Sequence, residues 1–386
     1  MSEPAPLVAI IGGGQLARML AEPAAALGVP LRLLAEAPGV SAAQVIVDQR
    51  VGDHRDLADL RAITAGAAVV TFDHEHVPTE HLRTLESDGV AVRPGPDALV
   101  HAQDKALMRE RLTALGVPCP RHAVVATPHD VVAFGLPCVL KTTRGGYDGK
   151  GVWFVRSTAD LEEPLAAAAA SGVALLAEEL VDFRRELSAL VARSPSGQAA
   201  AYPVVATEQR DGICHEVIAP APDLDPELAT EAQRIALQIA GELGVTGVLA
   251  VEMFETRDGR LLVNELAMRP HNTGHWTQDG AVTSQFENHL RAVLDLPLGS
   301  PAPREPWTVM VNILGGPHEQ VGRLFDGYPH AMARDPRLRV HLYGKELRPG
   351  RKVGHVNAYG DDLEDCLERA RHAAAWFRGD LGNESE

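Results

Sequence analysis

Apolar runs and helical stretches alternate along the first part of the chain. Residues 7–11 (LVAII) form a continuous apolar run that ends in three glycines, and residues 15–28 follow with helical spacing. Apolar runs at residues 30–36 and 67–75 repeat this order. Strands that alternate with helices are typical of a doubly wound parallel sheet. The pattern therefore predicts an N-terminal α/β domain of this kind over residues 1–97.

The pattern changes at a proline-marked junction. A short apolar stretch at residues 90–96 closes the first unit, and one helix is predicted from about Ala98 to Leu115. Beyond it, two apolar strands flank a glycine-rich segment, and longer strands and hairpins follow. We expect an α+β domain over residues 98–300, with a lid at about residues 120–182. A smaller β-rich segment over residues 301–386 ends in an amphipathic helix.

Composition narrows the class of protein. With 386 residues and 41.3 kDa, the chain is long enough for two or three domains. No apolar run approaches the roughly 20 residues of a membrane helix, and the first residues predict a strand rather than a signal peptide. A net charge of -16 disfavours nucleic acid and anionic membranes as partners. Four scattered cysteines are expected to be packing residues in a reducing cytoplasm: Cys119, Cys138, Cys214 and Cys366.

Two glutamates in a predicted hairpin are the most quantitative signal. Residues 258–259 (Asp-Gly) form a strong two-residue turn between two apolar runs. Pairing symmetric about this turn places Phe254 opposite Val263 and Glu252 opposite Glu265. The Cβ atoms of the two glutamates then lie about 4.5–5.5 Å apart, where like charges are destabilising.

A divalent cation between the carboxylates offsets this repulsion. Magnesium, with phosphate oxygens in its remaining positions, is the usual occupant of such an oxygen-only site. Asn264 alternates to the other face of the strand, but at the strand's end it can turn towards the same ligand. The alternative is an edge hairpin with two solvated glutamates.

The segment LKTTRGGYDGKG predicts an anion-binding lid. Its glycines allow backbone N–H groups to approach an anion closely, and Lys141 can reach a phosphate. A Walker A loop needs GK[ST] before a helix, whereas Lys150 precedes a glycine and a strand. The alternative is an ordinary mobile loop.

A basic cluster stands out in this acidic chain. The segment YGKELRPGRKVGHV carries five basic or imidazole side chains that suit a dianionic phosphate: Lys345, Arg348, Arg351, Lys352 and His355. A solvated basic loop is the alternative.

A short glycine motif supplies a rival function. Gly12, Gly14 and Ala17 follow the first strand, and Glu36 ends the second, which matches the dinucleotide fingerprint. A nicotinamide-dependent oxidoreductase is therefore a second hypothesis. It leaves the glutamate hairpin and both later anion sites unexplained.

Taken together, the motifs resemble the ATP-grasp superfamily and, within it, the N5-carboxyaminoimidazole ribonucleotide synthetase family. The resemblance spans nearly the whole chain through GGGQLARM, TFDHEHV, AQDKALMRERL, LKTTRGGYDGKG, EELVDFRRELS, NELAMRPHNTGHWTQDG and YGKELRPGRKVGH. It implies the ATP-grasp fold and a cytoplasmic, homodimeric ligase of purine biosynthesis. Such a ligase carboxylates 5-aminoimidazole ribonucleotide with ATP, Mg²⁺ and bicarbonate.

The resemblance also assigns roles by position. For ATP it implies Lys105, Lys141, Gly146, Tyr147, Asp148, Gly149, Lys150, Gly151, Glu178, Glu179, Leu180, Val181, Glu186, Gln209, Asn264 and Glu265. For the ribonucleotide it implies Gln15, Glu75, Tyr147, Arg269, His271, Asn272, Lys345, Arg351 and Lys352. Glu252, Glu265 and Asn264 would hold the metal, and the catalytic set would be Asp148, Lys150, His271 and Lys352.

The implied mechanism proceeds through carboxyphosphate. Bicarbonate attacks the γ-phosphate of ATP, carboxyphosphate releases CO₂, and the amine of the ribonucleotide takes it up, with Asp148 and His271 as hydrogen-bonding or proton-transfer groups. Gln209 stands where the family usually has histidine, and Met268 where proline is common. Formate-dependent glycinamide ribonucleotide transformylases and biotin-dependent carboxylases are competitors that RPHNTGH argues against. A nucleotide-binding regulatory protein is the non-enzyme alternative.

Overall fold

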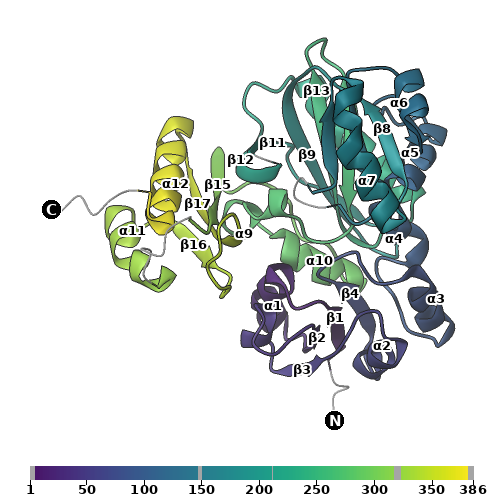
Figure 1. Cartoon of the computed structure of the whole chain (residues 1–386). Helices are drawn as coiled ribbons and strands as arrows, with labels where there is room; N and C mark the ends of the chain where they lie inside the picture. Colours follow the sequence, from purple (N-terminus) through teal and green to yellow (C-terminus); the bar gives the residue numbers. More distant parts are fainter. Residues whose placement is uncertain (1–4, 147–149, 211, 317–322, 381–386) are drawn as a thin grey trace.

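The computed structural model describes residues 5–146, 150–210, 212–316 and 323–380. The N-terminal sheet has the order β3-β2-β1-β4, with every pair parallel (Figure 1). Its elements are β1 (Val8–Ile11), α1 (Gln15–Leu27), β2 (Leu31–Ala35), β3 (Asp48–Val51), α2 (Leu57–Thr64), β4 (Val69–Phe72) and α3 (Thr79–Ser87). This confirms the predicted doubly wound parallel sheet. The apolar stretch at 90–96 contributes only an isolated bridge between Val92 and Val70.

The helix predicted from Ala98 to Leu115 is two helices, α4 (Pro96–Gln103) and α5 (Lys105–Ala114). The single-helix prediction is wrong because Asp104 has an extended backbone and caps α5, accepting from the N–H of Ala106 at 3.0 Å. The break makes Lys105 the first residue of α5, where its N–H donates to the carbonyl of Thr143.

The second sheet is antiparallel, with the order β5-β8-β6-β7. Its elements are β5 (His122–Val125), α6 (Pro128–Phe134), β6 (Cys138–Thr142), β7 (Val152–Val155), α7 (Glu162–Ser171) and β8 (Leu175–Glu179). These residues lie in the region predicted as the lid. A separate small apolar core, which includes Val131, Leu140 and Leu161, stabilises this unit.

Within the described residues, a nine-stranded antiparallel sheet forms the centre of the molecule. Its strands are β9 (Phe183–Arg193), β10 (Ala199–Ala201), β11 (Val205–Arg210), β12 (Ile213–Ala219), β13 (Gly247–Thr256), β14 (Leu261–Ala267), β15 (Trp307–Leu314), β16 (Arg339–Leu342) and β17 (Lys352–Gly360). The associated helices are α8 (Pro226–Glu242), α9 (Thr277–Gly280), α10 (Gln285–Val293), α11 (Tyr328–Arg334) and α12 (Leu363–Arg378). Because β15 pairs with β12, the C-terminal strands continue the central sheet.

Helix α10 joins the N-terminal domain to the central sheet (Figure 1). Phe286 and Leu290 of α10 share one buried cluster with Leu16 and Leu20 of α1. These contacts fix the start of α1 relative to the central sheet. In the described part of the chain, no helix is both long enough and apolar enough to cross a membrane.

Candidate functional site

The β13–β14 hairpin departs from the predicted turn. The N–H of Thr256 donates to the carbonyl of Arg260, so the loop has three residues instead of two. Phe254 consequently pairs with Leu262, and the predicted pairing with Val263 is wrong. A three-residue loop with glycine in the left-handed conformation is a common alternative to the two-residue turn.

A β-bulge then restores the predicted glutamate pair. The register shifts by one residue next to Glu252, leaving Asn264 as the extra residue, and Glu252 lies opposite Glu265 as predicted. A bulge re-aims the side chains beside it. Asn264 and Glu265 consequently meet neighbouring lysines: Lys141 Nζ donates to Asn264 Oδ1 at 3.0 Å, and Lys105 Nζ to Glu265 Oε1 at 2.7 Å.

The two carboxylates have opposite electrostatic surroundings. Burial and the neighbouring charge of Glu265 raise the pKa of Glu252 to about 8. Burial also acts to raise the pKa of Glu265, but the ammonium of Lys105 outweighs it and lowers that pKa. The raised pKa means that the ionised form of Glu252 is unfavourable in these surroundings, and a divalent cation beside it stabilises that form. Two carboxylates and the Asn264 amide supply only oxygen ligands, so these residues fit Mg²⁺; the metal assignment stays a prediction.

A buried ion cluster lies behind this hairpin; the sequence assigned its members Lys141 and Glu178 to ATP but did not reveal Arg109. Glu178 pairs with Lys141 at 2.6 Å and with Arg109 at 2.5 Å, and Arg109 is fully buried. Burial by itself raises the pKa of Glu178, but Arg109 and Lys141 lower it to about 2. Arg109 was detectable as a charged residue within the apolar stripe formed by Met108 and Leu112.

The glycine-rich lid loop is only partly described, and Tyr147, Asp148 and Gly149 lie outside the described residues. A Cβ at Gly146 would approach the carbonyl of Lys150 to 2.7 Å, so this position requires glycine. The carbonyl of Gly151 accepts from the N–H of Thr142, which closes the turn onto β6.

The remaining residues predicted to bind ATP follow β8 or lie on the central sheet. Leu180 and Val181 follow the end of β8, where Glu179 accepts from the N–H of Arg121 at 2.9 Å. Glu186 lies on β9, and burial raises its pKa to about 7. Gln209 lies on β11. These assignments stay predictions.

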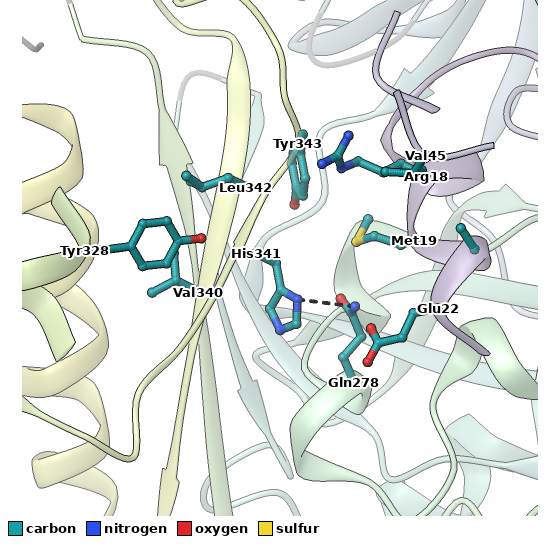
Figure 2. Close-up of a pocket in the computed structure, with 11 residues that line it drawn as sticks. Arg18, Met19, Glu22, Val45, Gln278, Tyr328, Val340, His341, Leu342 and Tyr343 are labelled. Carbon is teal, nitrogen blue, oxygen red and sulfur yellow. Dashed lines mark hydrogen bonds between the residues drawn. The ribbon is translucent and has the colours of Figure 1, made fainter. Parts of the chain in front are cut away.

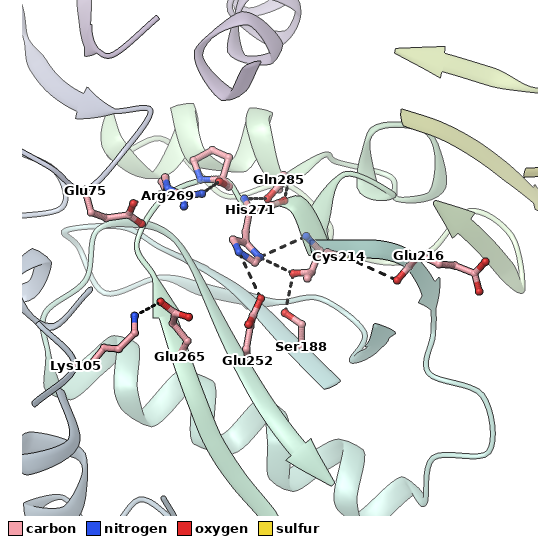
Figure 3. A network of polar contacts seen from close by, with 12 residues as sticks. Glu75, Lys105, Ser188, Cys214, Glu216, Glu252, Glu265, Arg269, His271 and Gln285 are labelled. Carbon is pink, nitrogen blue, oxygen red and sulfur yellow. Dashed lines mark hydrogen bonds and ion pairs between the residues drawn. The ribbon is translucent and has the colours of Figure 1, made fainter. Parts of the chain in front are cut away.

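The predicted substrate residues connect the N-terminal domain to the central sheet. Arg269 Nε donates to Glu75 Oε2 at 2.7 Å, and Lys345 Nζ donates to Gln15 Oε1. Figure 3 shows the Arg269 and Glu75 side chains close to the Lys105–Glu265 pair and to Glu252. Residues of the second and third sequence segments therefore each contact the N-terminal domain.

His271 has a defined hydrogen-bond arrangement. Its Nδ1 lies 2.9 Å from Thr273 Oγ1 and accepts from the Thr273 N–H at 3.4 Å, while Thr273 Oγ1 lies 2.8 Å from Ser188 Oγ. A backbone N–H can only donate, so Nδ1 is the acceptor and Nε2 carries the proton. Nε2 faces Glu252 Oε1 at 3.6 Å (Figure 3). Burial lowers the pKa of His271 well below its usual value, so the imidazole is neutral and its protonated Nε2 is available as a donor.

Asn272 and the basic segment complete the candidate site. Among the described residues, neither polar atom of the buried Asn272 amide has a hydrogen-bond partner, which fits a ligand contact. Lys352 begins β17 and acts electrostatically on Glu252 and His271. Arg351 is exposed.

Two members of the predicted basic cluster have other partners. Arg348 pairs with Glu346 at 2.7 Å, and His355 is buried with its Nδ1 2.7 Å from Tyr343 Oη. Arg348 and His355 are therefore engaged within the protein, and the prediction of an anion site rests on Lys345, Arg351 and Lys352.

The dinucleotide hypothesis fails at the first glycine turn. Asp73 accepts from the N–H groups of Gly14 and Ala17 at 3.1 and 2.7 Å, and Glu36 accepts from the N–H of Gly13 at 2.9 Å. These N–H groups are the ones that a pyrophosphate would need. The chain's own carboxylates fill this position.

His275 and Trp276 are buried packing residues. Gln285 Nε2 lies 3.0 Å from His275 Nδ1, and Trp276 packs edge-to-face against Tyr202. A cavity of about 450 Å³ lies elsewhere, between α1 and β16, and Figure 2 shows His341 and Gln278 on its wall. The residues that the sequence predicts for the site do not line this cavity.

Three family models match the chain. A ribonucleotide synthetase preATP-grasp domain matches residues 6–103, an ATP-grasp domain matches residues 110–286, and a phosphoribosylaminoimidazole carboxylase C-terminal domain matches residues 308–369.

Curated proteins and solved structures agree with these matches. The N5-carboxyaminoimidazole ribonucleotide synthase of Mycobacterium bovis is 59% identical over 97% of this chain and 88% of its own length. That of Corynebacterium ammoniagenes is 51% identical over 96% and 91%. A synthetase solved as its ADP complex has a TM-score of 0.88 at 36% identity and covers 98% of each chain. The Aspergillus clavatus enzyme, solved with ADP and 5-aminoimidazole ribonucleotide, has a TM-score of 0.88 at 31% identity over 97% of this chain and 99% of its own.

Proposed function

The chain belongs to the N5-carboxyaminoimidazole ribonucleotide synthase family of ATP-grasp enzymes, and from this membership we propose that it carboxylates 5-aminoimidazole ribonucleotide with ATP and bicarbonate. The product is N5-carboxyaminoimidazole ribonucleotide, an intermediate of purine biosynthesis. The reaction makes the chain an ATP-dependent ligase with Mg²⁺ as its metal.

Lys105, Lys141 and the β13–β14 hairpin carry out the first half of the reaction. A bicarbonate oxygen attacks the γ-phosphorus of ATP, the bond to the β-phosphate oxygen breaks, and carboxyphosphate and ADP form. Lys105 and Lys141 bind the nucleotide phosphates and offset the charge that develops on them. Glu252, Glu265 and Asn264 would hold Mg²⁺, which when bound would neutralise phosphate charge. Their oxygen-only donors and the crowded carboxylates support this assignment.

The second half of the reaction is carried out by residues that lie between the N-terminal domain and the central sheet. Carboxyphosphate divides into CO₂ and phosphate, and the amine nitrogen of the ribonucleotide forms a bond to the CO₂ carbon and gives its proton to the phosphate just released. His271 donates a hydrogen bond through Nε2 to the carboxyl oxygens; it is not the base, because its Nδ1 is engaged by the Thr273 N–H. Arg269, Lys345 and Lys352 bind the substrate phosphate and ribose. A closed lid keeps water from carboxyphosphate.

The observation that carries the proposal is the meeting of lysines, carboxylates and an amide at one bulge. The test measures ADP release with bicarbonate and 5-aminoimidazole ribonucleotide, and in parallel with formate and glycinamide ribonucleotide. We expect release that depends on the first pair. Release only with the second pair would instead identify a transformylase.

We further propose that the enzyme is a cytoplasmic homodimer. The family resemblance supports the dimer, and the four cysteines, all free thiols in the structure, support a reducing compartment. Sedimentation velocity of the full chain tests the dimer, and a monomer mass at micromolar concentration would contradict it.

A further inference from the structure

Arg109 makes three hydrogen bonds inside the protein, two of them to one strand. Its Nη1 donates to the carbonyl of Val263 at 2.8 Å, and its Nη2 donates to the carbonyl of Asn264 at 2.7 Å. Its Nε donates to Glu178 Oε1 at 2.5 Å. The side chain is fully buried, and α5 delivers it to β14 from more than 150 positions away in the sequence. Arg109 therefore spans the lid strand β8 and the bulged strand β14.

The two carbonyls lie at the bulge beside Glu252. A bulge locally disrupts the ladder of backbone hydrogen bonds, and a buried carbonyl without a partner is destabilising. The planar guanidinium reaches both carbonyls with two parallel N–H groups, whereas an ammonium cannot present that fork. The guanidinium thus favours the bulged backbone over a regular strand.

The same guanidinium also acts on the side chain of the bulged residue. Glu178, held by Arg109, binds Lys141 through its other oxygen at 2.6 Å, and Lys141 donates to Asn264 Oδ1 at 3.0 Å. The contacts form a closed ring from Arg109 through Glu178, Lys141 and Asn264 back to Arg109. The buried guanidinium of Arg109 therefore fixes the backbone carbonyl of Asn264 directly, and it fixes the side-chain amide of Asn264 through Glu178 and Lys141.

We propose that Arg109 is a positioning residue that holds the β14 bulge in the shape that presents Asn264 and Glu265 to nucleotide-bound Mg²⁺. The inference rests on the proposed function only for the identity of the ligand. A regular strand at this position would turn Asn264 and Glu265 to opposite faces, and the metal would lose one oxygen ligand.

The test is the substitution Arg109→Lys, read by electron paramagnetic resonance of Mn²⁺ titrated into the full-length protein with saturating ADP. We expect the Kd for Mn²⁺ to rise about tenfold or more, since one hydrogen bond from a charged donor has about that effect. The KM for the ribonucleotide should change less than about twofold. Unchanged Mn²⁺ affinity in a folded variant overturns the proposal.

Arg369→Lys is the matched control. Arg369 is likewise held by a carboxylate, Asp335 at 2.7 Å, and by the carbonyl of Tyr359 at 2.8 Å, but in the C-terminal segment. We expect this variant to lose stability while its Mn²⁺ affinity stays that of the wild type. An equal loss of Mn²⁺ affinity in both variants would show a general effect of stability and also overturn the proposal.

A second comparison applies if Arg109→Lys does not fold. The double variant Arg109→Gln, Glu178→Gln removes both charges of the buried pair. Lys141 loses its carboxylate partner equally in the double variant and in Glu178→Gln alone, so the comparison isolates Arg109. We expect its Mn²⁺ affinity to fall about tenfold below that of Glu178→Gln alone, and equal affinities refute the role of Arg109. Because Mn²⁺ binding with ADP needs no ribonucleotide, these results stand even if the wild type fails to carboxylate the proposed substrate.

Discussion

The substitution Glu265→Gln tests the role of the hairpin in the reaction separately from its contribution to the stability of the protein. The change removes one negative charge and keeps the shape of the side chain. Glu265 lies opposite Glu252 and 2.7 Å from Lys105, so the substitution removes one repulsion and one attraction together. The expected result is a folded protein that forms ADP at only a small fraction of the wild-type rate.

The two effects on stability nearly cancel. At about 5 Å and an effective dielectric constant of about 20, two like charges repel by roughly 3 kcal/mol, and this repulsion applies above the pKa of about 8 at which Glu252 is ionised. A hydrogen bond between charged groups contributes about 1.5–3 kcal/mol. The Glu265 side chain is 42% exposed, and solvent reduces both effects. Above about pH 8, where Glu252 is ionised, we expect the free energy of unfolding to change by about 1 kcal/mol or less.

The effect on the rate of phosphoryl transfer is larger, because no second change compensates for the lost carboxylate charge. Loss of one charged group that faces the reacting phosphates costs about 3–4 kcal/mol, or a factor of roughly 100 to 1,000 in rate. ADP release at saturating ATP, bicarbonate and Mg²⁺ measures it, with urea denaturation as the folding check. Glu208→Gln, an exposed carboxylate on β11, is the control and should keep full activity. Full turnover in Glu265→Gln would refute the metal assignment.

Three further substitutions test other parts of the site. Lys352→Ala should raise the KM for the ribonucleotide far more than the KM for ATP in steady-state assays, and an equal effect on both would contradict a role in substrate binding. Gly14→Ala should destabilise the protein by about 2 kcal/mol or more in urea denaturation, because a Cβ there would overlap the carboxylate of Asp73. Its control is Gly241→Ala, in α8 with open space around it, which should be neutral or stabilising by up to about 1 kcal/mol. Glu178 has its pKa lowered from 4.5 to about 2, so its contribution to stability is complete above pH 4.5 and is lost as the pH falls towards 2. Urea midpoints measured over that window should fall less steeply in Glu178→Gln than in the wild type, and parallel curves would show that this carboxylate is not held as an ion.

Much of the fold and of the chemical pattern followed from local sequence. The alternation of apolar runs and helical stretches predicted the parallel N-terminal sheet, and the structure confirms it. The glutamate pair was predicted correctly although the turn was not, because a longer loop and the bulge at Asn264 shift the register in opposite senses. The helix break at Asp104 was missed, since a capping aspartate competes with helix continuation only when its side chain turns back on the backbone.

By itself the sequence determined which side chains carry charge, which strands and turns bear them, and the family pattern they form. Tertiary structure alone decided their partners. The guanidinium of Arg109 meets carbonyls of β14, and Ser188 fixes the hydrogen bonding of His271 through Thr273, across long stretches of chain. Asp73 similarly fills the glycine turn that resembled a dinucleotide site. Hydrogen bonds act only at short range, whereas the spacing of residues in a sequence reports neighbours along one helix or strand. Contacts between elements are therefore set by how the sheets and helices pack.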